Sequence, residues 1–142
     1  VLEFMNYIIR KIRQDTDSYL FERKVERMLL QHGFLVARLE SLNGLNIGDL
    51  IAITKDQRVF IFEVKDSQPP WICNNVKEWN QYLMVNEDYR IPIVFVFRNW
   101  EQKRPRIYCT TFNNVMLDGG RVIVEKKMLL RDFLSSYRMC NR

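Results

Sequence analysis

The chain has 142 residues, of which 47% are hydrophobic and 27% are charged, with only five glycines and four prolines. This composition is typical of a folded globular domain and excludes a disordered or fibrous protein. No apolar run approaches the roughly 18 residues that a membrane-spanning helix needs, and no export signal is evident, so we expect a cytoplasmic protein with no membrane partner. The 22 basic and 17 acidic residues give a net charge of +5, which favours a polyanionic partner.

Cysteine and histidine are scarce, which limits the kinds of site that the chain can build. Cys73, Cys109 and Cys140 are odd in number and far apart, so neither a disulfide framework nor a zinc cluster is expected. The single histidine, His32, excludes a site with two histidine ligands. We therefore expect any catalysis to depend on carboxylates and lysine, and the cysteines to be small apolar core residues in a reducing compartment.

The N-terminal part of the sequence predicts two helices. Apolar residues recur at helical spacing over residues 2–13 and again over 19–32. Between them, Asp, Thr, Asp and Ser at positions 15–18 form a turn-prone cluster that can cap the second helix. Gly33 then provides a stop signal for that helix.

The rest of the sequence alternates between strands and helices. Strands are predicted over residues 34–39, 49–54, 58–64, 93–97, 106–111 and 121–124. Two further helices are predicted, one from about residue 71 or 74 to residue 86 and one over residues 127–137. Only residues 55–57 link the second and third strands, so these two strands form a hairpin. We therefore predict a single α/β domain over residues 1–142, with a central mixed β-sheet flanked by α-helices.

Three charged residues converge at one end of this hairpin. Asp49 begins one strand, whereas Glu63 and Lys65 end its antiparallel partner, and residues two apart on a strand share a face. Two carboxylates this close repel each other unless a divalent cation lies between them, and hard oxygen ligands suit Mg²⁺ or Mn²⁺. Lys65 could polarise an attacking water or stabilise negative charge. The group predicts metal-assisted hydrolysis of a phosphodiester; the alternative is the charged rim of a surface hairpin.

A second Glu-x-Lys sequence occurs at Glu125 and Lys127, also after a strand-like run. The tripeptide is common by chance, so the upstream spacing has to distinguish the two copies. Only six residues lie between Asp118 and Glu125, too few for two paired strands and a turn. We therefore expect no second site there.

Residues 19–97 resemble the PD-(D/E)XK nuclease superfamily and, in particular, the archaeal Holliday-junction resolvases. The resemblance rests on Phe-Glu-Arg at 21–23, Gln-His-Gly-Phe-Leu-Val-Ala-Arg at 31–38, Gly-Asp-Leu-Ile-Ala at 48–52 and Ile-Phe-Glu-Val-Lys at 61–65. Gly48 stands where the superfamily motif has proline. The resemblance implies a restriction-endonuclease-like core and a nuclease that uses Mg²⁺ or Mn²⁺.

The same resemblance implies roles for individual residues. The catalytic residues would be Glu22, Asp49, Glu63 and Lys65, and the metal would be bound by Glu22, Asp49, Glu63 and the backbone carbonyl of Val64. Arg38 and Ser41 resemble residues that line the DNA-facing side of the site, and Gln81 is a weaker match to a polar helix residue. Glu26, one turn after Glu22, is the alternative helix glutamate.

Basic residues also gather around Trp100, at positions Arg98, Lys103, Arg104 and Arg106. Basic side chains interleaved with an aromatic residue are typical of a groove that follows a nucleic-acid backbone. A solvated charged loop gives the same pattern, so both interpretations stand for this segment.

These features together predict a Mg²⁺-dependent endodeoxyribonuclease that acts on branched or duplex DNA, with a four-way junction as the expected substrate, in recombination or repair. Such an enzyme would work at the nucleoid or in a virus-infected host cell. Symmetric cutting of two strands implies a homodimer, for which the first and last helices are candidate surfaces, although both could equally belong to the core. The alternatives are a nuclease of the same fold with a restriction, repair or viral substrate, and a non-catalytic module that binds nucleic acid or protein.

Overall fold

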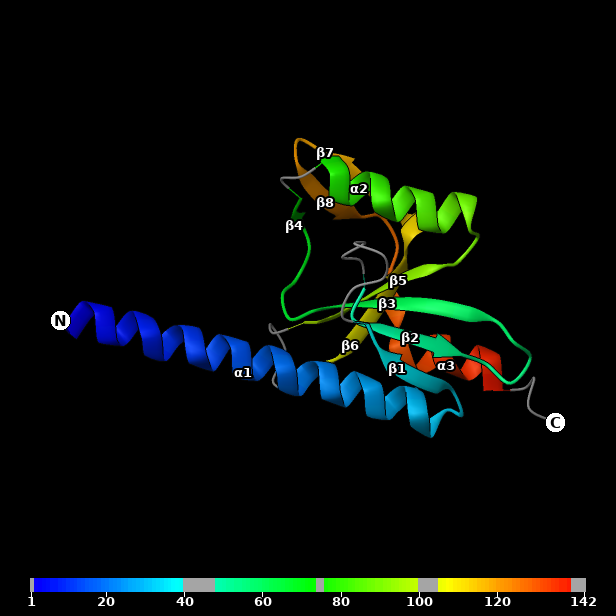
Figure 1. Cartoon of the computed structure of the whole chain (residues 1–142), viewed down its shortest axis with the longest axis horizontal. Coiled ribbons are helices and arrows are strands. Elements are labelled where there is room, and N and C mark those ends of the chain that lie inside the picture. Colours follow the sequence, from blue (N-terminus) through cyan, green and yellow to red (C-terminus); the bar gives the residue numbers. More distant parts are fainter. Residues whose placement is uncertain (1, 40–47, 74–75, 100–104, 139–142) are drawn as a thin grey trace.

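The computed structural model describes residues 2–39, 48–73, 76–99 and 105–138 (Figure 1). Its helices are α1 (Leu2–Gln31), α2 (Val76–Leu83), which continues as a π-helical turn over Met84–Asp88, and α3 (Leu130–Arg138). Its strands are β1 (Leu35–Arg38), β2 (Leu50–Ile53), β3 (Val59–Lys65), β4 (Trp71–Ile72), β5 (Ile93–Arg98), β6 (Ile107–Thr111), β7 (Val115–Asp118), β8 (Arg121–Val124) and β9 (Met128–Leu129). A 3-10 turn, Phe112–Asn114, precedes β7.

Six of these strands form one mixed sheet in the order β1-β2-β3-β5-β6-β9. Neighbouring strands run antiparallel except β3 and β5, which are parallel and are connected through β4 and α2. The remaining strands form a small antiparallel sheet in the order β4-β8-β7. The predicted central mixed sheet with flanking helices is therefore confirmed.

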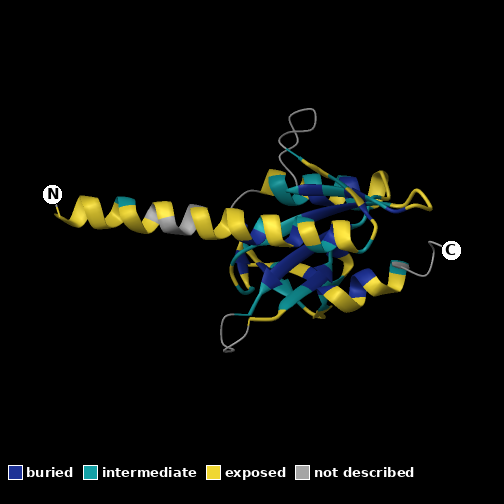
Figure 2. Cartoon of the chain, turned by 90° about the horizontal axis from the view of Figure 1, so that it is seen from below, coloured by how far each residue is buried: buried dark blue, intermediate teal, exposed yellow. Residues whose placement is uncertain are grey.

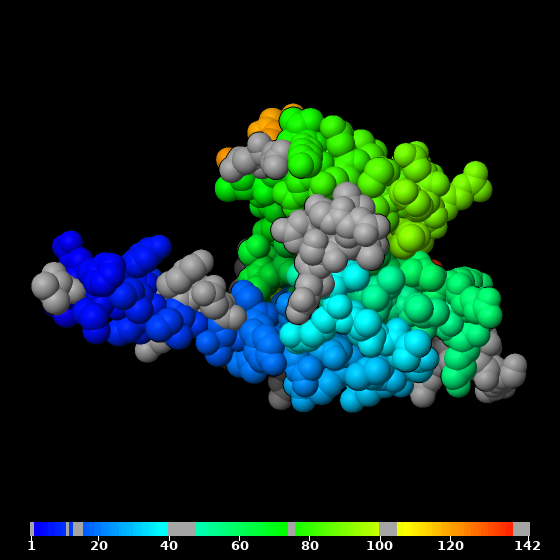
Figure 3. All heavy atoms as spheres, viewed as in Figure 1, coloured from blue at the N-terminus to red at the C-terminus, as the bar shows by residue number. Residues whose placement is uncertain are grey.

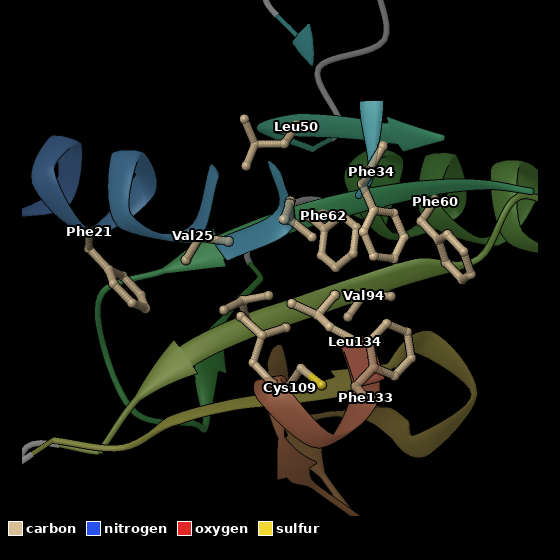
Figure 4. Close-up of a cluster of buried hydrophobic side chains, with 14 residues drawn as sticks. Phe21, Val25, Phe34, Leu50, Phe60, Phe62, Val94, Cys109, Phe133 and Leu134 are labelled. Atoms are coloured by element: carbon tan, nitrogen blue, oxygen red, sulfur yellow. The ribbon is translucent and has the colours of Figure 1, made fainter. Parts of the chain in front are cut away.

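Hydrophobic cores cover both faces of the large sheet. On one face, α1 contributes Phe21, Val25 and Leu29, and α3 contributes Leu130, Phe133 and Leu134 (Figure 4). On the other face, α2 and the small sheet pack against Ile61 and Phe95. Residues of β3 alternate between the two cores, because successive side chains of a strand point to opposite faces. Phe60 and Phe62 enter the α1–α3 core and Ile61 enters the α2 core.

The prediction of two N-terminal helices was wrong, because α1 continues without a break from Leu2 to Gln31. The turn-prone residues 15–18 lie inside this helix. Thr16 donates its hydroxyl to the carbonyl oxygen of Ile12 at 2.8 Å, so its polar group is satisfied within the helix. No glycine or proline interrupts the segment, and the weak preference of Asp, Thr and Ser for caps is too small to end it.

The predicted helix after the Pro69-Pro70 break starts later than expected. Trp71 belongs to β4, where its ring stacks on Phe95 with 5.6 Å between centroids and its Nε1 donates to the carbonyl oxygen of Ser67. Strands β7 and β9 were not predicted. β7 is half exposed and β9 has two residues, so neither has a long apolar alternation to reveal it.

The N-terminal half of α1 stands out from the rest of the molecule (Figures 1 and 3). Figure 2 shows this half as almost entirely exposed, whereas the C-terminal half lies on the sheet. Its exposed large apolar residues are Leu2, Phe4, Met5, Tyr7, Ile9 and Ile12, each 45–75% accessible, and Tyr19 and Leu20 are exposed further along the helix. Among the described residues, no helix is both long and apolar enough to cross a membrane.

Cys73 and Cys109 are buried in the two cores and are not linked in a disulfide. Burial raises the pKa of the Cys109 thiol to about 12, so it remains protonated and behaves as an apolar residue. Cys140 lies outside the described residues.

Candidate active site

The pairing of β2 with β3 brings Asp49 and Glu63 together. Leu50 pairs with Phe62, which places Asp49 opposite Glu63 at the end of the antiparallel ladder. The amide N–H of Val64 donates to Oδ2 of Asp49 at 2.7 Å, and the amide N–H of Gly48 donates to Oε2 of Glu63 at 2.8 Å. Each strand therefore fixes the carboxylate of the other, and both side chains are held in defined orientations.

Gly48 is required at this position by its backbone. Its φ of +81° lies in the left-handed region, and a Cβ built on it would lie 2.3 Å from Cγ2 of Ile61. Proline, which the superfamily motif has here, could neither adopt this φ nor donate an N–H to Glu63. The departure from the motif therefore has a structural reason in this chain.

Lys65 completes the cluster from the same strand. It lies two residues after Glu63 and on the same face of β3, the face toward α2 that Ile61 also occupies. Its Nζ is 3.4 Å from Oε1 of Glu63, and the two side chains are only 28% and 15% exposed. A partly desolvated ammonium group thus adjoins two carboxylates.

Glu22 approaches the cluster from α1. Its Oε1 is 3.9 Å from the guanidinium of Arg38, whose Nε is 3.4 Å from Oε2 of Glu26. Arg38 therefore bridges both candidate helix glutamates to β1, and it also lies over the ring of Tyr19. Burial, and then the nearby Asp49, raise the pKa of Glu22, which places this glutamate beside the cluster.

The electrostatics of the cluster disfavour its negative charge. Burial, and then repulsion by Asp49, raise the pKa of Glu63 to about 7 despite the opposing effects of Lys65 and Gly48. Burial also raises the pKa of Asp49, against the Val64 amide and Lys65. Burial and Asp49 raise the pKa of Glu22 above its ordinary value. The site therefore contains more acidic groups than its own cations neutralise.

This donor set fits a hard divalent cation. No group of three or more His, Cys, Asp or Glu side chains among the described residues is already close enough to enclose a metal ion. Asp49 and Glu63 nevertheless present carboxylate oxygens side by side, in a setting that raises the pKa of both and so penalises their charge. Carboxylate oxygens are the ligands that Mg²⁺ and Mn²⁺ prefer, and a bound cation would remove that penalty.

Other predicted site residues lie outside the cluster. Arg98 is 15% exposed, and its guanidinium binds Asp66, with 3.0 Å from Nε to Oδ1, and covers the ring of Phe21 at 4.2 Å. It thus ties the ends of β3 and β5 to α1. Gln81 is half-buried on α2, and no hydrogen bond or ion pair joins it to the cluster within the described part of the chain. Val64 adjoins the cluster through its amide, as described above.

The remaining predicted nucleic-acid contacts divide into two sets. Arg106 is exposed just before β6 and lines a cavity beside α1. Ser41, Lys103 and Arg104 lie outside the described residues.

Sequence reasoning missed Tyr82, which lies over the cluster from the α2 side. Its ring contacts Phe95 edge-on, and Phe95 is the β5 partner of Glu63. Its hydroxyl donates to Oε1 of Glu78 at 3.2 Å. Burial raises the pKa of Tyr82, and Glu63 and Glu78 raise it further, so the hydroxyl remains a donor. The four-residue spacing of Glu78 and Tyr82 on a helix was the available signal.

The second Glu-x-Lys sequence shows why the hairpin matters. Contrary to the spacing argument, β7 and β8 do pair, with Gly119 and Gly120 forming the turn at positive φ. Asp118, however, pairs with Arg121 at the turn, whereas the amide of Glu125 binds Asn114 at the opposite end. The two carboxylates are thus kept apart by the length of the hairpin.

Comparison with known proteins identifies the fold. The sequence matches no protein-family model, and no curated protein is significantly similar to it. Hjc, a Holliday junction resolvase from the archaeal hyperthermophile Archaeoglobus fulgidus, has a similar solved structure, with a TM-score of 0.62 and 15% sequence identity. The likeness covers 84% of this chain and 96% of that chain. The chain therefore has the restriction-endonuclease-like fold of an archaeal Holliday junction resolvase, in agreement with the resemblance of residues 19–97.

Proposed function

We propose that this protein is a divalent-metal-dependent endonuclease that hydrolyses DNA phosphodiester bonds, with branched DNA such as a Holliday junction as its substrate. One observation carries the proposal. At the end of the β2–β3 hairpin, Asp49 and Glu63 each accept an amide N–H from the opposite strand, and Lys65 lies 3.4 Å from Glu63. The fold on which they lie is that of a resolvase, which supports the same reading.

The residues of the cluster have separate roles in this proposal. Asp49 and Glu63 would hold Mg²⁺ or Mn²⁺, with Glu22 and the backbone carbonyl of Val64 as further ligands. Bound there, the cation would polarise the phosphodiester and lower the pKa of an attacking water. Lys65 stabilises the negative charge that develops on the scissile phosphate. Arg38 positions Glu22 through its guanidinium and provides a contact for DNA.

The test is cleavage of end-labelled four-way junction, linear duplex and single strand, each with Mg²⁺, with Mn²⁺ and with chelator. We expect paired symmetric nicks in the junction, lost in chelator and reduced at least ~100-fold by Glu63→Gln, a loss typical of removing a group that stabilises the transition state. Glu125→Gln is the matched control, because this exposed glutamate belongs to the Glu-x-Lys sequence that has no opposing carboxylate.

The same assay separates the alternatives. Cutting of every substrate would retain the metal site but assign the enzyme to the restriction, repair or viral nucleases of this fold. Binding of DNA without any cleavage would contradict the proposal and leave a non-catalytic binding module. Metal binding has an independent readout: Mn²⁺ should raise the thermal midpoint of the parent protein, and Asp49→Asn should abolish the rise.

A homodimer is part of this proposal, and the structure favours one of its two candidate surfaces. α3 buries Leu130, Phe133 and Leu134 in its own core, so its apolar face is already used. The N-terminal half of α1 leaves six large apolar residues exposed, and it projects away from the other described elements (Figure 2). We assign this half of α1 as the dimer surface. As part of the same proposal, the protein would work inside the cell, where branched DNA is formed.

A further inference from the structure

A cavity of about 290 Å³ opens between α1, the start of β6 and the start of α3. It is lined by Lys24, Met28, Pro105, Arg106, Ile107, Leu129 and Arg131. Three of the seven residues are cations and four are apolar, and none is acidic. Low-dielectric walls around like charges concentrate the positive potential, so this cavity attracts anions.

The cations of the cavity are not neutralised by the protein. Lys24 and Arg106 form no ion pair within the described part of the chain. The positions one turn away from Lys24 on α1 are occupied by Leu20, Phe21, Arg27 and Met28, so no helix neighbour supplies a carboxylate. Arg131 has only an exposed contact of 3.7 Å between its Nε and Oδ1 of Asp132. An anion bound here would relieve this excess of positive charge.

The cavity lies at the same end of the sheet as the acidic cluster. The backbone carbonyl of Arg106 accepts from the amide of Asn99, next to the end of β5. β5 runs parallel to β3, so Arg106 and Lys65 both lie at the end of the sheet where these strands finish. Lys24 is two residues after Glu22, which puts them on opposite sides of α1 because each residue advances a helix by about 100°. α1 thus separates the cluster from the cavity.

We propose that this cavity binds a phosphate group of the nucleic-acid backbone other than the one that is cleaved. The inference rests on the proposed function, since the scissile phosphate would lie at the cluster, across α1. A helix with its side chains is about 10–12 Å wide, and the major groove of a duplex is about 12 Å wide. A duplex can therefore present one phosphate to the cluster and a second to the cavity. Lys24, Arg106 and Arg131 are binding residues that position the substrate.

The test is DNA binding in chelator, measured by fluorescence anisotropy with duplex and four-way junction over a range of salt concentrations. Lys24→Gln and Arg106→Gln should each weaken binding and lower the slope of log Kd against log salt by about 1, and the double variant by about 2. Both side chains are exposed, so the variants should fold as the parent does. Lys55→Gln is the matched control, because this exposed lysine lies at the β2–β3 turn, at the other end of the sheet.

Unchanged affinity and salt dependence in the double variant would overturn the proposal. Binding of small anions only would also overturn it. In that case inorganic phosphate would raise the thermal midpoint of the parent but not of the double variant, while both proteins would bind DNA equally well. Because chelator prevents cleavage, the result is independent of catalysis. A parent that binds DNA through the cavity but never cuts it would overturn the proposed nuclease and leave this site in place.

Discussion

Glu63 is the single residue whose environment departs furthest from that of a surface carboxylate. Its pKa of about 7 in the folded protein, against an ordinary value of 4.5, means that the folded state binds a proton more tightly than the unfolded state does. Stability from this group is therefore fully present below pH ~4.5 and is lost as the pH rises through ~7. A pKa difference of this size corresponds to about 3 kcal/mol at most.

We predict that the free energy of unfolding of the parent, in chelator, falls between pH 5 and pH 8 relative to that of Glu63→Gln. The glutamine cannot ionise, so the stability of the variant relative to the parent should increase as the pH rises. Urea denaturation at a series of pH values measures the difference. A constant difference across this range would show that Glu63 is not strained by burial and by Asp49, and would weaken the case for a cation between them.

At the scale of elements, the aromatic contacts of α3 determine how firmly β3 holds the site. Phe133 lies 5.9 Å from Phe60, 6.4 Å from Phe62 and 5.3 Å from Tyr137, measured between ring centroids. We predict that Phe133→Ala lowers the free energy of unfolding by about 3–5 kcal/mol, because the cavity left behind cannot collapse fully. Ser135→Ala, on the exposed side of the same helix, should change it by no more than ~0.5 kcal/mol. Equal effects of the two would mean that α3 does not pack on β3.

The elements also show where sequence reasoning succeeds and where it stops. The β2–β3 hairpin was predictable because an apolar alternation, a short polar link and strand-end charges all agree, and this agreement located Asp49, Glu63 and Lys65. The continuity of α1 was not predictable from local signals. The capping preferences of residues 15–18 disfavour a helix, but by less free energy than the helical backbone hydrogen bonds contribute. The roles of Tyr82 and Lys24 depend on tertiary neighbours. Tyr82 packs against Phe95, and Lys24 lines the cavity together with the start of β6. The four-residue spacing of Glu78 and Tyr82 was a weak local signal for Tyr82, and no local pattern marks Lys24.

At the scale of the whole molecule, the exposed half of α1 is the feature that a monomer leaves unexplained. A helix of this length is marginal alone in water, and one with apolar residues on several sides needs a partner surface. Half-exposed side chains of this size would bury roughly 100 Å² each, so the six in this half would bury roughly 600 Å² per partner, at the lower end of the ~1,200–2,000 Å² total of a stable interface.

We therefore predict a dimer in solution that depends on this half of α1. Ile9→Asp and Ile12→Asp should each place a charge in the apolar interface and give a monomer by sedimentation velocity at micromolar concentration. Asn6→Asp, which adds the same charge at an exposed polar position of the helix, should remain a dimer. Because two symmetric cuts need two active sites, the Ile9→Asp monomer should nick a four-way junction once where the parent makes paired cuts. Paired cutting by a protein that sediments as a monomer would show that another surface joins the two copies on DNA.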